Sequence, residues 1–249
     1  MKTPFVDRAS EMRYLLELAE RGSPLPLFIY GPEGCGKTRL LEELREEAKR
    51  RGYLVLYVDA KERDHRRALR GSSREIAEVA LEVLTAAGSL GTALAWALAR
   101  VIDLYDRRLR FRGRRALLMV DEVVEGIGLS DVERYAKALH DLVRELVEER
   151  GAESVLAIAT TSEGSSRELL SRHGYLRLSY LWNLDEASFT ELVKALGALS
   201  TVVERVFELT SGNPEGPHRH RRPGVENRSL ARGSVRREGQ APQVREGGC

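Results

Sequence analysis

Gly-Pro-Glu-Gly-Cys-Gly-Lys-Thr, residues 31–38, matches the phosphate-binding loop (P-loop) pattern GxxxxGK[ST] in full. The glycines leave room for backbone N–H groups to surround the phosphates of a nucleotide, while Lys37 can reach the β and γ oxygens and the Thr38 hydroxyl can bind Mg²⁺. An apolar run of strand length, residues 25–30, precedes the loop, and helix-forming sequence follows it. This order places the loop at a helix N-terminus, where unpaired N–H groups and the helix dipole favour an anion. We expect the following residues to bind the nucleotide: Gly31, Pro32, Glu33, Gly34, Cys35, Gly36, Lys37 and Thr38.

A second motif lies at the end of another apolar run. Residues 116–120 read Ala-Leu-Leu-Met-Val, as expected for a parallel strand covered on both faces, and Asp121 and Glu122 follow directly. A nucleotide hydrolase needs a carboxylate in the Mg²⁺ shell and a base that orients water. We therefore expect Asp121 to hold the metal together with Thr38, and Glu122 to activate the attacking water. The alternative is a strand that merely ends in acidic residues.

Further strand-like runs alternate with helical sequence. Residues 53–59 follow the helix after the loop, and residues 155–161 follow a helix whose start carries Ser130 and Glu133 at capping-box spacing. Alternating strands and helices are typical of an α/β fold with a parallel sheet flanked by helices. The motifs and this alternation together predict the P-loop nucleotide-binding fold.

Hydroxyl side chains end the last of these strands. Thr160, Thr161 and Ser162 would point at the γ-phosphate if their strand lies between the strands that carry the loop and Asp121. We therefore include Thr161 among the expected catalytic residues, with Lys37 and Glu122. Ordinary capping of the strand end is the alternative.

Four segments of the chain carry a family resemblance: Phe-Val-Asp-Arg at residues 5–8 with Glu11, the loop at 31–38, the acidic pair at 121–122, and Leu-Thr-Ser-Gly-Asn-Pro at 209–214. With these segments the chain is similar, over residues 4–215, to the archaeal ATPase family, a group related to the AAA+ and STAND NTPases. The two central motifs are shared by many P-loop ATPases, so the outer two segments supply most of the specificity.

The resemblance implies an ATP-binding sheet in the order 5-1-4-3-2, a helical lid and usually a C-terminal winged-helix domain. It also implies that the segment before the first helix contacts adenine, here through Val6 and its neighbours. From the residues alone, Asp7 is an N-cap for a helix over residues 8–20. Two amphipathic stretches, residues 185–196 and 200–209, are the expected lid helices.

The composition divides the chain into three parts. Residues 1–183 would form the ATPase core, 184–215 a partial helical lid and 216–249 a tail. The tail is rich in Arg, Gly, Pro and His and has no aromatic residue, so it cannot bury enough apolar surface to fold. A basic tail that binds nucleic acid or an acidic partner is one interpretation; a shift of reading frame near residue 216 is the one we favour. A complete lid would then lie beyond the break, and the chain could bind ATP yet hydrolyse it poorly.

Length and charge limit the class of protein. A chain of 249 residues with 42% hydrophobic content can bury one substantial core and a small lid. A net charge of +2 argues against a uniformly basic nucleic-acid binder. The basic clusters at residues 61–74 and 106–115 could contact phosphates of DNA or RNA, or coat solvated faces and helix ends. Residues 1–215 lack Gln and are rich in Arg and Glu, a composition that favours a thermophilic source.

Cysteine usage and hydropathy indicate a cytoplasmic protein. Two cysteines, Cys35 and Cys249, do not make a disulfide framework, and the N-terminus lacks a signal-peptide pattern. The uncharged stretch at residues 83–99 is too short and too weakly hydrophobic for a spanning helix, so we expect a buried helical hairpin and no membrane partner.

The sequence therefore predicts Mg²⁺-dependent binding and hydrolysis of ATP that drives a conformational switch. Two alternatives stay open: a scaffold that binds ATP or ADP without significant turnover, and a DNA-loading or origin-recognition-type ATPase. ATP and ADP are the expected small-molecule partners, and DNA, a protein partner and oligomerisation are left open. Arg167 and Arg172 would serve a neighbouring subunit as arginine fingers, or simply carry surface charge.

Overall fold

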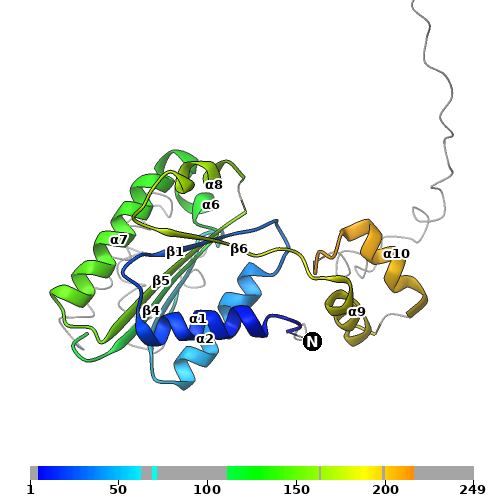
Figure 1. Cartoon of the computed structure of the whole chain (residues 1–249), viewed down its shortest axis with the longest axis horizontal. Helices are drawn as coiled ribbons and strands as arrows, with labels where there is room; N and C mark the ends of the chain where they lie inside the picture. Colours follow the sequence, from blue (N-terminus) through cyan, green and yellow to red (C-terminus); the bar gives the residue numbers. More distant parts are fainter. Residues whose placement is uncertain (1–4, 63–68, 72–110, 163, 198–199, 216–249) are drawn as a thin grey trace, which may run out of the picture.

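A computed structural model of the chain describes residues 5–62, 69–71, 111–162, 164–197 and 200–215. These residues form a sheet with the strand order β3-β2-β4-β5-β1-β6 (Figure 1). The strands are β1 (Leu27–Tyr30), β2 (Leu54–Asp59), β3 (Leu69–Gly71), β4 (Arg115–Asp121), β5 (Ser154–Thr161) and β6 (Arg177–Tyr180).

Parallel pairing runs from β2 through β4, β5 and β1 to β6, whereas β3 lies antiparallel to β2 at one edge. Ala159 of β5 is in register with Phe28 of β1 on one side and with Val120 of β4 on the other. The strand with the hydroxyl residues thus lies between the loop strand and the acidic strand, as its predicted role requires. Numbering only the parallel strands gives 5-1-4-3-2, which confirms the order implied by the resemblance.

Helices cover both faces of the sheet. Leu117 and Met119 of β4 pack on the side of α1 and α2, while Leu118 and Val120 pack on the side of α6 and α7. Side chains alternate along a strand, so a strand covered on both faces needs apolar residues at every position. This explains the continuous apolar runs of the sequence. The helices are α1 (Ala9–Arg21), α2 (Lys37–Arg50), α6 (Val123–Ile127), the 3₁₀ helix η1 (Leu129–Asp131), α7 (Val132–Glu148), α8 (Gly164–Ser171), α9 (Glu186–Ala195) and α10 (Ser200–Thr210).

Helices α9 and α10 form a small unit beside the end of the sheet (Figure 1). They share an apolar cluster built around the fully buried Phe189, whose ring meets Phe207 edge-on at a centroid distance of 5.4 Å. Asp185 caps α9, because its carboxylate accepts a hydrogen bond from the backbone N–H of Ser188 at 2.8 Å. Both helices lie within two residues of the boundaries expected for the lid.

Two expected helix caps are wrong. Asp7 adopts a left-handed backbone (φ 46°) and its carboxylate accepts from the Ser188 hydroxyl, so α1 starts at Ala9 with Arg8 in the cap position. The capping box of Ser130 and Glu133 does not form, since α7 begins at Val132 with no side-chain cap. In both places a side chain instead contacts a distant part of the chain, Asp7 with Ser188 and Glu133 with His173, and sequence spacing does not reveal such contacts.

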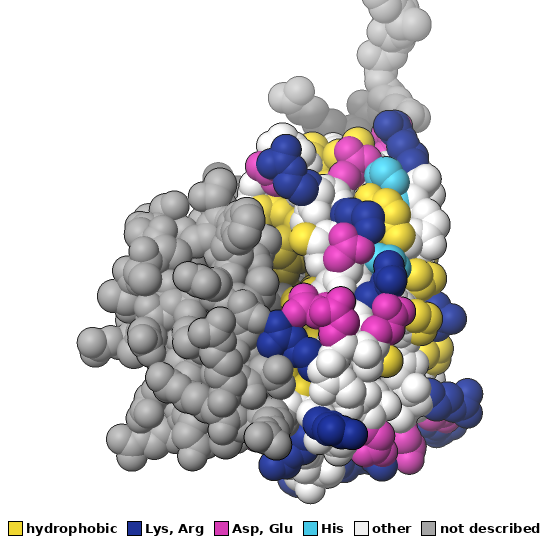
Figure 2. All heavy atoms as spheres, turned by 90° about the vertical axis from the view of Figure 1, so that its left-hand side faces the viewer, with side chains coloured by type: hydrophobic (Ala, Val, Ile, Leu, Met, Phe, Trp, Pro, Cys, Tyr) yellow, Lys and Arg dark blue, Asp and Glu magenta, His cyan; other side chains and the backbone are white. Residues whose placement is uncertain are grey.

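Figure 2 shows the face at the left-hand side of Figure 1, where basic and acidic side chains are intermixed. Helix α7 itself carries the oppositely charged pairs Lys137–Asp141 and Arg144–Glu148, whose members are one helical turn apart. The described part of this face is therefore not a uniformly basic surface.

Several predictions concern residues outside the described part of the chain. They are the hairpin at 83–99, the tail at 216–249 and most of the two basic clusters. Within the described segments, no helix has both the length and the apolar character needed to cross a membrane.

Candidate functional site

The loop at residues 31–38 connects β1 to α2. Gly36 occupies the N-cap of α2 with φ 101°, a left-handed conformation that a residue with a side chain rarely adopts, and Lys37 is the first helical residue. Because α2 starts here, the loop ends at the positive end of a helix dipole. The loop forms part of the wall of a cavity of about 420 Å³.

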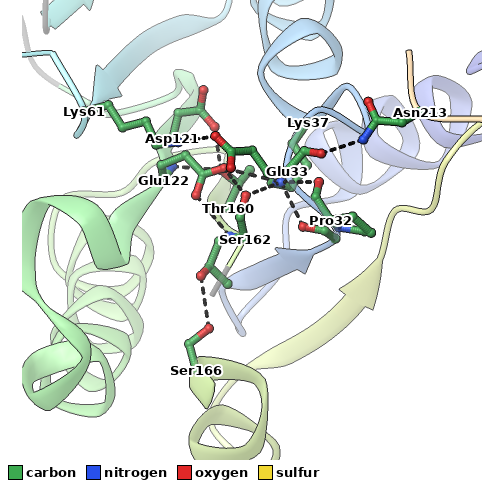
Figure 3. Close-up of polar contacts among 12 residues, drawn as sticks. Pro32, Glu33, Lys37, Lys61, Asp121, Glu122, Thr160, Ser162, Ser166 and Asn213 are labelled. Atoms are coloured by element: carbon green, nitrogen blue, oxygen red, sulfur yellow. Dashed lines mark hydrogen bonds and ion pairs between the residues drawn. The ribbon is translucent and has the colours of Figure 1, made fainter. Parts of the chain in front are cut away.

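Lys37 is the centre of the polar network beside this cavity (Figure 3). Its side chain is buried, and its ammonium donates to the carbonyl oxygens of Gly31 at 2.9 Å and Pro32 at 3.1 Å and to the Ser162 hydroxyl at 2.6 Å. The ammonium also lies 3.3 Å from Glu122 Oε1. The Lys37 ammonium is thus held against the backbone carbonyl groups at the start of the phosphate-binding loop.

Asp121 is fixed by two hydroxyl groups. The Tyr57 hydroxyl donates to Asp121 Oδ2 at 3.0 Å, and the Thr160 hydroxyl donates to Oδ1. Burial, and then the neighbouring carboxylate, raise the pKa of Tyr57 well above its usual value, so the phenol keeps its proton and stays a donor. The carboxylate is nearly buried and lies on the wall of the cavity.

Glu122 has an unusual backbone. Its φ of 52° is left-handed, which is uncommon for a residue other than glycine and is often found at functional sites. The Ser162 backbone N–H and hydroxyl donate to its two carboxylate oxygens at 3.0 and 2.5 Å. In addition, the Glu122 N–H donates to Thr160 Oγ1 at 2.9 Å. Glu122 is therefore held beside Lys37 by the end of β5.

These contacts place a helix N-terminus, a buried lysine and two strand-end carboxylates around one cavity. A family model described as "ATPase domain predominantly from Archaea" matches residues 5–216. The chain belongs to this family. It is thus an ATPase domain with the P-loop fold, as the resemblance implied.

Known proteins add a likeness of fold. The Aeropyrum pernix ORC1 protein, solved in complex with DNA, superposes with a TM-score of 0.53 at 20% identity, covering 87% of this chain and 58% of that one. A replication initiator DnaA bound to AMPPCP and single-stranded DNA gives 0.50 at 20% identity, with coverages of 88% and 61%. The chromosomal replication initiator DnaA of Aquifex aeolicus is 57% identical over 35 residues, 14% of this chain and 9% of DnaA. The chain thus spans less than two thirds of the length of each.

The hydroxyl residues of the ATPase domain do not lie as expected. Thr160 and Thr161 are fully buried and neither lies on the cavity wall, since Thr160 pairs with Asp121 and Thr161 with the Ser166 hydroxyl at 3.0 Å. Neither hydroxyl therefore faces the cavity, and the catalytic role of Thr161 stays a prediction. Alternation along the strand explains this, because Thr161 faces the opposite side from Thr160 and Ser162. Ser162 is the hydroxyl that contacts Lys37.

The donor set fits a magnesium ion. Thr38 is exposed and lines the cavity, as does Asp121, and oxygen ligands of this kind suit Mg²⁺. Mg²⁺ in nucleotide sites is usually bound by one or two protein side chains together with phosphate oxygens and water. Asp59, which ends the neighbouring β2, also lines the cavity; burial and the charge of Asp121 raise its pKa.

Apolar side chains from both ends of the domain complete the cavity. Phe5 and Val6 precede α1, and Leu184 and Leu192 belong to the lid region. Val6 thus lies on the cavity wall, and its contact with adenine stays a prediction. The sequence did not indicate Arg8 or Asp59 as site residues, nor the cavity-lining Pro214 and Glu215. Two features of the sequence could have indicated some of them: the Gly-Asn-Pro box contains Pro214, and Asp59 lies at the end of a strand.

Arg167 and Arg172 lie on α8 and near its end. The Arg167 guanidinium lies 5.2 Å from the centre of the exposed Tyr180 ring, and Arg172 pairs with Glu168. Their role towards a neighbouring subunit stays a prediction.

Proposed function

We propose that this domain binds ATP with Mg²⁺ in the cavity, hydrolyses it, and uses the reaction to move the lid of α9 and α10 relative to the core. The contact of Lys37 with Glu122, beside Asp121 and at the N-terminus of α2, carries the proposal. It brings the cation for a γ-phosphate, the base for water and the ligand for a metal to one place.

Each group has a task in this proposal. Backbone N–H groups of the loop and Lys37 bind the phosphates, and the apolar wall of Val6, Leu184 and Leu192 covers the base. Thr38 and Asp121 would hold Mg²⁺, which would supply positive charge against the phosphates. Glu122 orients a water and accepts its proton. The water oxygen bonds to the γ-phosphorus while the bond from that phosphorus to the β–γ bridging oxygen breaks, so ADP and phosphate leave.

Environment explains why Glu122 suits the role of base better than Asp121. Asp121 accepts from two neutral hydroxyls and lies on the metal side of the site, whereas Glu122 is held beside Lys37 by a backbone N–H and a serine hydroxyl. A γ-phosphate that binds Lys37 competes for the ammonium that now contacts Glu122. Nucleotide binding therefore frees the carboxylate for water.

Binding measurements test the nucleotide site. Titration with MgATP should show binding by the native chain and none by Lys37→Ala. Lys61→Ala is the matched control, because Lys61 also lines the cavity but is exposed and pairs only loosely with Glu33 at 3.7 Å. Equal binding by the two variants would remove Lys37 from the site. Asp121→Asn should shift the magnesium concentration required for turnover upwards.

A second proposal is that the domain acts on DNA, as an origin-recognition-type ATPase does. The 35-residue match to a chromosomal replication initiator supports it. Phosphate release with and without single- and double-stranded DNA separates the possibilities. Stimulation by DNA supports this proposal, slow turnover without stimulation supports the switch, and binding without turnover supports a scaffold. Three further proposals concern the protein as a whole. They are its location in the cytoplasm, its oligomerisation, and the division of the chain into core, lid and tail.

A further inference from the structure

Two carbonyl groups of the phosphate-binding loop are held by side chains from outside it. The Asn213 side-chain amide donates to the carbonyl oxygen of Glu33 at 2.8 Å, and the Arg8 guanidinium donates to that of Cys35 at 3.1 Å. Figure 3 shows Asn213 reaching the loop at Glu33. The two residues come from opposite ends of the domain, one before α1 and one after α10.

The geometry of the peptide bond gives these contacts a consequence. All peptide bonds described here are trans, so each carbonyl points away from the N–H group of the next residue in the same rigid plane. Holding the Glu33 carbonyl therefore orients the Gly34 N–H, and holding the Cys35 carbonyl orients the Gly36 N–H. Both glycines line the cavity.

Asn213 is fixed at both ends of its amide. While its nitrogen donates to Glu33, its oxygen accepts from the Glu215 backbone N–H at 2.9 Å, so the orientation of the amide follows from its partners. The contact is close: a Cβ added at Gly34, where φ is 80°, would lie 2.6 Å from the Asn213 oxygen. The absence of a side chain at Gly34 permits the segment after α10 to lie against the loop.

Arg8 ties the same loop to the segment that leads into the lid. The nitrogen that contacts Cys35 also donates to the Trp182 carbonyl oxygen at 2.5 Å, and the other terminal nitrogen contacts Glu11 at 2.9 Å. The guanidinium is buried and presents its donors in a rigid plane. A change in the path of the Trp182 segment would therefore change the position of the donor on Cys35.

We propose that Arg8 and Asn213 are positioning residues that hold the Glu33–Gly34 and Cys35–Gly36 peptides in their phosphate-binding orientation. Because both side chains also contact segments that flank α9 and α10, the affinity of the loop for phosphate depends on the docking of the lid. This inference rests on the proposed function, since it assumes that the loop binds the phosphates of a nucleotide.

The test compares ligands that share the adenine end or the phosphate end of ATP. Asn213→Ala should weaken binding of ATP and of pyrophosphate about five- to tenfold, which corresponds to one lost hydrogen bond. Binding of adenosine, which has no phosphate, should stay within about twofold of the native value. Asn183→Ala is the matched control, because Asn183 donates to the Ser211 carbonyl of the same lid segment at 3.0 Å and does not contact the loop. It should leave both affinities unchanged.

Arg8→Lys provides the second variant. It keeps the positive charge but loses the planar fork, so a purely electrostatic role would leave phosphate affinity at its native value, whereas positioning predicts a loss like that of Asn213→Ala. Thermal unfolding of each variant shows whether the domain is intact. Equal affinities of Asn213→Ala and Asn183→Ala for pyrophosphate would overturn the inference, as would a parallel loss of adenosine binding. If the native chain binds neither ATP nor pyrophosphate, the proposed function itself fails.

Discussion

Replacing Thr160 by valine tests how the ends of β4 and β5 are joined. The Thr160 side chain is fully buried and makes two contacts, donating to the Asp121 carboxylate and accepting from the Glu122 N–H. Valine has nearly the same shape, so Thr160→Val opens little cavity but removes both bonds. A lost bond to a charged group costs about 1.5–3 kcal/mol, and a buried N–H without an acceptor costs about 1–3 kcal/mol. We expect the free energy of unfolding to fall by about 3 kcal/mol, or Tm by about 6–12 °C.

Urea unfolding followed by circular dichroism measures the change. Thr210→Val is the control, because it makes the same substitution in the partly exposed α10, where water can replace the contact of the hydroxyl with the Val206 carbonyl. Its cost should stay below about 1 kcal/mol. The reasoning is refuted if the two variants lose the same stability. ATP turnover should also fall in Thr160→Val, since Asp121 and Glu122 lose a shared partner.

Three further predictions concern the loop and the lid. Burial raises the pKa of the Cys35 thiol. In a Cys249→Ser variant, Cys35 should therefore react slowly with iodoacetamide at pH 8 while the protein is folded, and rapidly in urea. Fast labelling of the folded protein, measured by mass spectrometry, would contradict this. Phe189→Ala should cost about 3–5 kcal/mol and open the lid first, so amide exchange should accelerate in α9 and α10 before the sheet; uniform acceleration would count against a separate lid cluster. The Ser188 N–H lowers the pKa of Asp185 in the folded protein. The stability that this cap contributes is therefore complete above the ordinary aspartate pKa of about 4, and it is lost as the pH falls through the lower pKa of the folded state. Asp185→Asn should narrow the difference between the urea midpoints measured at pH 7 and pH 3.

Much of the fold could be predicted because its signals are local. The apolar runs at residues 25–30, 53–59, 116–120 and 155–161 mark four of the parallel strands to within two residues. The strand β6 was missed, because only two of its four residues are apolar and it lies at the edge of the sheet beside β1, where burial on both faces is not required. The antiparallel strand β3 was also missed, because it lies at the other edge of the sheet and falls within the basic cluster at residues 61–74.

The candidate site, like the fold, could be predicted only in part. Lys37, Thr38, Asp121 and Glu122 follow from motifs whose spacing the backbone enforces, and the cavity gathers all four. Arg8 could not be found from sequence, since its partners at Cys35 and Trp182 are 27 and 174 residues away and are backbone atoms, which carry no residue signature. Which hydroxyl contacts Lys37, that of Thr161 or that of Ser162, depends on the exact residue at which β5 ends, and a sequence pattern fixes such a boundary only approximately.

Turnover by a Glu122 variant tests the central claim most directly. Phosphate release from MgATP should be lost in Glu122→Gln, which keeps the shape of the side chain but removes its basic oxygen, while the affinity for ATP stays close to that of the native chain. Glu125→Gln makes the same change on an exposed residue three positions along, in α6, and should hydrolyse ATP at the native rate. Native turnover by Glu122→Gln would contradict the assignment of this carboxylate as the base, and loss of ATP binding would show that it acts on the nucleotide instead of the water.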